Sequence, residues 1–158
     1  MNFEQLLAKL ERAWDLQDHP HATPATEEQL QAFETHYGVR LPSDLRSYFK
    51  TLNGGDLGHN GSMDAEMICF WRLDQVQTQE ELNDGKLGRK DLFGFADWSV
   101  DCQTYEIELH SDANAPTPVF IDFGPELQKV AESFSAFIDG YLRSDWKVLY
   151  GVQQKPSA

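Results

Sequence analysis

Apolar residues in the first third of the chain recur every three or four positions, the spacing of a helix with one buried face. The first such stripe predicts an amphipathic helix over residues 3–14. It comprises Phe3, Leu6, Leu7, Leu10, Ala13 and Trp14. Pro20 and Pro24 then predict an extended linker, because the residue before a proline avoids the helical region.

Two further helices are expected between residues 26 and 53. Thr26 and Gln29 have the spacing of a capping box, and Gly38 is a suitable left-handed residue to end the helix that they begin. Pro42 suits the first turn of the next helix, which ends at Asn53. The apolar stripes of these helices are Leu30, Phe33, Tyr37, Leu45, Tyr48, Phe49 and Leu52.

The middle of the chain changes to short apolar runs and alternation. Runs at residues 67–71, 92–98 and 119–121 predict short strands. Between residues 105 and 110, apolar and polar side chains alternate, which predicts a half-buried strand whose acidic outer face carries Glu106 and Glu108. The short spacing around residues 113–116 favours antiparallel neighbours joined by a turn.

Helical spacing returns after residues 124–125 and predicts a closing helix. Its stripe is Leu127, Val130, Phe134, Phe137, Ile138 and Tyr141. Helices, then strands, then a helix indicate an α+β fold, with N-terminal helices, a mostly antiparallel sheet and a closing C-terminal helix. The length of 158 residues is that of one domain, so we expect a single domain over residues 1–158.

Composition and charge narrow the classes of function. A hydrophobic share of 41% with 12% aromatic residues excludes a disordered chain. The net charge of −13 argues against nucleic acid or an anionic membrane as a partner, because phosphates would be repelled. No apolar run approaches the roughly 20 residues of a membrane helix, and the N-terminus lacks the apolar core of a signal peptide. We therefore expect a cytoplasmic protein, with Cys69 and Cys102 packed as small apolar groups.

Motifs for cofactors and nucleophilic catalysis are missing from the sequence. The glycine-rich segment 53–61 follows a helix and lacks the Gly-Lys-Ser/Thr ending of a phosphate loop. There is no Gly-x-Ser-x-Gly motif, and neither cysteine belongs to a Cys-x-x-Cys pair. His19 and His21 lie in the expected linker, where two imidazoles are poorly preorganised for a metal. We expect no cofactor, no metal and no catalytic residue.

The negative charge is concentrated in the strand half of the chain. Between Lys90 and Lys129 there is no other Lys or Arg, yet the interval contains eight acidic residues. Such carboxylates could serve a small hydrolase through a pair with one raised pKa, or simply keep a strand face solvated. They would also speed the encounter with a positively charged protein. The candidate partner-binding residues are Asp97, Trp98, Asp101, Glu106, Glu108 and Asp112, with Trp98 as an apolar anchor.

Several segments together resemble the SUKH superfamily. They are Glu27-Glu28-Gln29-Leu30, the run from Tyr37 to Leu45 containing Leu41-Pro42-Ser43-Asp44, Leu52-Asn53-Gly54-Gly55, Phe93-Gly94-Phe95-Ala96-Asp97, Pro118-Val119-Phe120 and the segment from Ala131 to Ile138. The resemblance spans about residues 26–142, with a helix and linker at residues 1–25 outside the shared core. The superfamily includes bacterial toxin-immunity proteins and a yeast regulator of cell-wall synthesis.

The resemblance implies a binding module without catalytic activity. The leading hypothesis is an immunity protein that binds and neutralises a cognate, basic toxin domain by stoichiometric occlusion. Toxins that act on nucleic acids are often basic, because they bind phosphates. The alternatives are a regulatory scaffold with an endogenous partner and, less favoured, a carboxylate-dependent hydrolase. The sequence leaves the oligomeric state open.

Overall fold

Six antiparallel strands form one sheet in the computed structural model, which describes residues 1–152. The last six residues of the expected domain, 153–158, lie outside the described part. The strands are arranged in the order β1-β3-β4-β5-β6, and β2 also pairs with β3. Their bounds are β1 Ile68–Phe70, β2 Gln77–Thr78, β3 Leu92–Trp98, β4 Gln103–Glu108, β5 Val119–Asp122 and β6 Leu127–Ala131.

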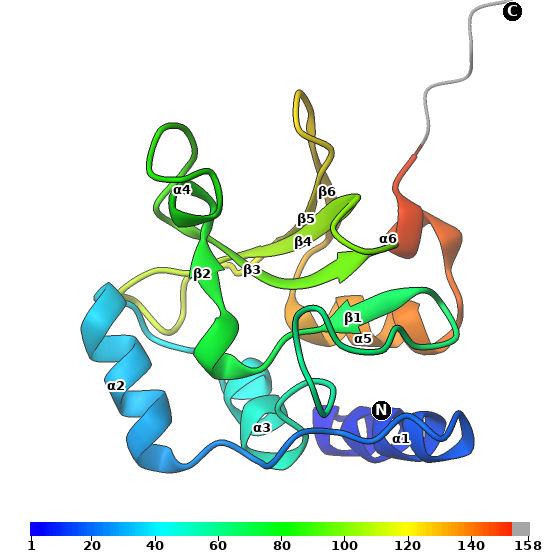
Figure 1. Cartoon of the computed structure of the whole chain (residues 1–158). Coiled ribbons are helices and arrows are strands. Elements are labelled where there is room, and N and C mark those ends of the chain that lie inside the picture. The colour runs from blue at the N-terminus through cyan, green and yellow to red at the C-terminus, as the bar shows by residue number, and fades with distance from the viewer. Residues whose placement is uncertain (153–158) are drawn as a thin grey trace, which may run out of the picture.

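Helices cover one face of this sheet (Figure 1). The N-terminal helices are α1 (Phe3–Leu16), α2 (Glu27–Tyr37) and α3 (Ser43–Thr51), and α5 (Phe134–Leu142) follows the strands. Phe95 of β3 packs edge-on against Phe134 and Phe137 of α5, so the main core lies between the sheet and the helices. This arrangement confirms the expected α+β fold with N-terminal helices, an antiparallel sheet and a C-terminal helix.

The helix boundaries near the N-terminus follow from local hydrogen bonding. Thr26 and Gln29 form the predicted capping box at the start of α2. Gly38 ends that helix with φ of 67°, a left-handed conformation that glycine adopts without a steric penalty. The predicted helices at the start of the chain are therefore confirmed, together with the capping signals that define α2.

The closing helix begins later than its apolar spacing predicts. Residues Leu127–Ala131 form strand β6, which pairs with β5, and α5 starts after Ser133. The Ser133 hydroxyl accepts a hydrogen bond from the backbone N–H of Ala136, as in a helix N-cap. The prediction of helix for residues 127–131 was wrong, because apolar residues three apart do not separate a helix from a half-buried edge strand.

Four short elements have no periodic signal in the sequence. They are the 3₁₀ helix η1 (Leu73–Gln75), strand β2, helix α4 (Gln79–Leu82) and helix α6 (Trp146–Tyr150). Helix α4 lies on the sheet face opposite the main helices (Figure 1). A Cβ added to Gly94 of β3 would lie 2.8 Å from Leu82 Cδ1, which shows how closely α4 covers that strand. Across residues 1–152, every helix is too short or too polar to cross a membrane.

Candidate functional site

The strand register brings three of the six candidate residues to one face of the sheet. Asp97 is paired with Thr104, and Glu106 with Gly94, so both side chains point away from the main helices. Glu108 has the same orientation, two residues further along β4. Tyr105 points to the opposite face and packs against Phe137 in the core.

Glu106 is buried on this face, with only 1% of its surface exposed. Gln79 of α4 donates hydrogen bonds to Glu106 Oε1 at 2.9 Å and to Asp122 Oδ2 at 3.2 Å. Burial, with the neighbouring Asp122 carboxylate second, raises the pKa of Glu106 to about 8. The expectation that Glu106 lies on a solvent-facing acidic surface was therefore wrong, because α4 covers it.

The pair of Glu106 and Asp122 has one property of a catalytic dyad, which is a carboxyl group that remains protonated at neutral pH. A substrate would have to reach that carboxyl group, and its 1% exposure leaves no such access. The pair instead holds α4 against the sheet through Gln79.

Asp97 is also buried, at 2% exposure, and has its own internal partners. It accepts hydrogen bonds from Trp71 Nε1 at 2.6 Å and from the backbone N–H of Asp101 at 3.0 Å. His59 contacts Asp101 at 2.7 Å, and its ring lies 4.4 Å from that of Trp71. Asp97 thus fixes the β3–β4 turn, and Asp101 is the exposed member of this group.

Glu108 is partly exposed and is bound by a neighbouring cation. Arg89 contacts Glu108 Oε1 at 2.6 Å and Asp91 Oδ2 at 2.8 Å. His110 Nε2 lies 2.9 Å from the other carboxylate oxygen of Glu108. The guanidinium therefore offsets much of the negative charge that the sequence places here.

Asp112 and Trp98 lie apart from the three acids on the sheet face. Asp112 is exposed in the β4–β5 loop, which follows one end of β4, whereas Asp101 precedes the other end. Trp98 lies on the helix side, where its ring is 6.0 Å from that of Tyr150. Its indole N–H has no hydrogen-bond partner among the described residues. The six candidates therefore do not form one continuous exposed patch.

Two groups place histidine and carboxylate ligand atoms within 4.8 Å of one another: His59 with Asp97 and Asp101, and Asp91 with Glu108 and His110. Their carboxylates already accept hydrogen bonds or ion pairs from Trp71 in the first group and Arg89 in the second. Both groups are thus explained as structural networks.

The two cysteines are both free thiols, Cys69 buried and Cys102 exposed. Burial, with Asp97 second, raises the pKa of the Cys69 thiol to about 11. The thiol donates to the carbonyl oxygen of Gly58 at 2.7 Å. Cys69 is therefore protonated at neutral pH, which is the opposite of what a nucleophilic cysteine requires.

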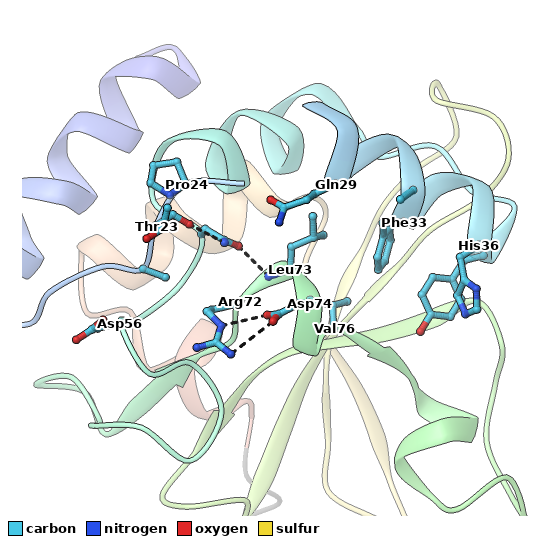
Figure 2. A pocket seen from close by; sticks show the side chains of 14 residues that line it. Thr23, Pro24, Gln29, Phe33, His36, Asp56, Arg72, Leu73, Asp74 and Val76 are labelled. Atoms are coloured by element: carbon cyan, nitrogen blue, oxygen red, sulfur yellow. Dashed lines mark hydrogen bonds and ion pairs between the residues drawn. The ribbon is translucent and has the colours of Figure 1, made fainter. Parts of the chain in front are cut away.

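A groove of about 640 Å³ lies between α2 and the segment containing η1. Figure 2 shows Gln29, Phe33 and His36 on the α2 side and Arg72 and Asp74 on the other. The first wall is a stripe of α2 residues at positions i, i+3, i+4, i+7 and i+8, namely Gln29, Ala32, Phe33, His36 and Tyr37. The facing wall consists of Arg72, Leu73, Asp74 and Val76.

Asn53 connects the segments that border this groove. Its amide donates to the carbonyl oxygen of Thr23 at 2.9 Å and accepts from the backbone N–H of Leu73 at 2.8 Å (Figure 2). Gly54 has φ of 78°, and a Cβ there would lie 2.4 Å from the carbonyl oxygen of Trp71. The Asn-Gly pair therefore permits the close approach of residues 53–54 to residues 71–73, and so shapes the groove.

The groove combines an apolar floor with charged margins. Phe33, Leu73 and Val76 are buried beneath it. At its margin, Arg72 Nε lies 3.1 Å from Asp74 Oδ1, and Asp56 is exposed. Sequence reasoning missed this site, because Phe33 and Tyr37 match an ordinary core stripe and residues 72–76 have no periodicity. The Asn-Gly-Gly motif was the available signal, and it was interpreted only as a helix end.

Comparison with known proteins identifies the family. No curated protein matches the chain. The model of the SMI1 / KNR4 family (SUKH-1) matches residues 24–140, which include the whole sheet and both main walls of the groove, from α2 and from residues 72–76. Because this match covers well over half of the chain, the protein belongs to the SMI1 / KNR4 family (SUKH-1).

Proposed function

We propose that the protein is an immunity protein, which binds a cognate, basic toxin domain and neutralises it by stoichiometric occlusion. The observation that carries this proposal is the family match over residues 24–140, since the SUKH superfamily includes toxin-immunity proteins. Its action requires no catalysis. The buried Glu106 carboxyl and the protonated Cys69 thiol are consistent with that.

Charge supports a basic partner. The chain has a net charge of −13, and between Lys90 and Lys129 there is no other Lys or Arg. Charged groups at the margin of an interface act chiefly on the association rate. We assign that role to Asp101, Glu108 and Asp112, which are at least partly exposed. The buried Asp97 and Glu106 would act indirectly, because they hold the β3–β4 turn and α4 in place.

A regulatory scaffold is the second candidate. The family that matches carries the SMI1 / KNR4 name, and the superfamily also includes a yeast regulator of cell-wall synthesis. A scaffold would bind an endogenous protein and would protect against no toxin.

Growth rescue of a host that expresses a toxin distinguishes the immunity protein from the regulatory scaffold. Toxin domains encoded by the source organism are expressed singly in a sensitive host, with and without the full chain. The immunity proposal predicts that at least one toxin is neutralised, and that the purified pair forms a 1:1 complex. If every toxin stays lethal, and the tagged chain retains several endogenous proteins at about 0.5 M salt, the result supports the scaffold hypothesis instead. Surface charge alone would not hold those proteins, because the Debye length there is about 4 Å.

A further inference from the structure

We propose that the groove between α2 and residues 72–76 is the docking site for an extended partner segment that presents an apolar side chain beside a Lys or Arg. This inference deepens the proposed function and rests on it for the identity of the partner. The groove is distinct from the acidic strand face to which the sequence points.

The dimensions of the groove fit a short peptide segment. The stripe on α2 runs from Gln29 to Tyr37, which at 1.5 Å per residue makes a wall about 12 Å long. An extended chain advances about 3.3 Å per residue, so three or four residues match that length. The volume of about 640 Å³ accepts their side chains.

The floor of the groove selects an apolar side chain. Phe33, Leu73 and Val76 lie beneath it, and Ala32 projects at the exposed rim. The small Ala32 side chain leaves room above Phe33 that a larger residue would fill. Burying an aliphatic or aromatic side chain in the groove is favourable, because its own apolar surface leaves water together with the exposed apolar surface of Pro24 and Ala32.

The charged margin selects a cation rather than an anion. Arg72 is already paired with Asp74, so its charge is largely offset. The Asp56 carboxylate is exposed and has no ion pair or side-chain hydrogen bond among the described residues. A Lys or Arg beside the apolar side chain would supply its partner, which agrees with the basic toxin proposed above.

The groove walls are held before any partner arrives. Asn53 joins the linker to η1 through two hydrogen bonds, and the α2 capping box fixes Gln29 against Thr26. A preformed site binds with a smaller ordering cost than a site that must assemble. This preorganisation favours docking of a flexible segment onto a rigid groove.

A peptide titration tests the groove directly. The full chain, labelled with ¹⁵N, is titrated with a synthetic peptide that contains Lys-Leu-Phe-Lys. Matched peptides replace both lysines by glutamate or both apolar residues by serine. We expect amide shifts at residues 29–37 and 72–76, and affinity at least about tenfold lower for each replacement peptide. No shifts, or shifts confined to residues 92–108, would overturn the proposal.

Two variants of α2 provide the matched pair. Ala32→Tyr fills the groove, whereas Gln31→Tyr adds the same side chain at an exposed position outside it. Ala32→Tyr should lower the peptide affinity at least about tenfold, and Gln31→Tyr should leave it unchanged. Equal affinity in both variants would refute the groove as the site, even if the chain neutralises a toxin. Groove binding without any growth rescue would instead refute only the toxin as the partner.

Discussion

The acidic face of β3 and β4 and the groove beside α2 differ in what their side chains already contact. On the strand face, Asp97, Glu106 and Glu108 each have a protein donor within 3 Å. In the groove, Pro24 and Ala32 leave apolar surface exposed, and Asp56 at its margin has no ion pair among the described residues. A high local charge therefore does not identify the surface that is free to bind.

The same comparison separates stability from binding. The carboxylates of the strand face connect α4 and the β3–β4 turn to the sheet, so changing them should alter folding. The groove depends on Asn53 for its shape, but its exposed rim at Ala32 takes little part in the core. Substitutions in the two regions should therefore affect different measurements.

The largest expected effect is that of Glu106→Lys. An ammonium group in place of this buried carboxyl would lose the contact with Gln79 and be desolvated, which should cost about 3–5 kcal/mol of unfolding free energy. Urea unfolding measures this loss. Asp112→Lys, at an exposed position, is the control and should change stability by less than about 0.5 kcal/mol. Equal, small effects of both substitutions would mean that Glu106 is not buried.

The pH dependence of stability gives the next largest effect. The pKa of Glu106 is about 8 in the folded chain and near the ordinary glutamate value of 4.5 when unfolded, so the folded state binds one more proton than the unfolded state between these pH values. The free energy of unfolding should fall as pH rises through this window, by at most about 1.4 kcal/mol per pH unit. Glu106→Gln keeps the shape and removes the titration.

Chemical denaturation of wild type and Glu106→Gln at several pH values measures this pH dependence of stability. The variant should gain stability relative to wild type as pH rises from about 5 to 8, and the gain should level off above that. A constant difference across this range would contradict a raised pKa at Glu106.

A smaller loss is expected for Asn53→Ala. The substitution removes both side-chain hydrogen bonds to Thr23 and Leu73 in a buried position, which should cost about 2 kcal/mol. It should also weaken peptide binding, because the wall at residues 72–76 is no longer fixed. Thermal unfolding and the peptide titration measure the two effects, with the exposed Asn114→Ala as control. Full peptide affinity in Asn53→Ala would show that the groove does not depend on this residue.

The smallest effects should come from Asp101→Asn and Asp112→Asn. Both positions are exposed, so each variant should unfold within about 0.5 kcal/mol of wild type. Association with a basic toxin should slow a few-fold at low salt and be nearly unchanged at high salt, because long-range attraction is screened. Stopped-flow kinetics at two salt concentrations distinguish this from a contact role, which would raise the dissociation rate at both.

The sequence was sufficient for elements that local chemistry defines. The stripe from Phe3 to Trp14, the capping box at Thr26 and the left-handed Gly38 all act within one helix, and each was predicted correctly. The alternation that places Tyr105 in the core and Glu106 on the opposite face was also read correctly.

The burial of Glu106 was not predictable in this way, because it depends on α4, a four-residue helix without a periodic apolar pattern. Residues 127–131 were misassigned because the pairing of β6 with β5 is a tertiary feature. The groove was missed because Phe33 has the same spacing as any core residue. The groove beside Phe33 exists because of where residues 72–76 lie, and Asn53 fixes that position through its hydrogen bond with Leu73.

The most direct test of the account is growth rescue by three versions of the full chain against a toxin domain that the wild type neutralises. Wild type, Gln31→Tyr and Ala32→Tyr are expressed at equal levels, and their thermal unfolding is compared. We predict that wild type and Gln31→Tyr protect the host, whereas Ala32→Tyr folds equally well and does not. Full protection by Ala32→Tyr would contradict binding through the groove.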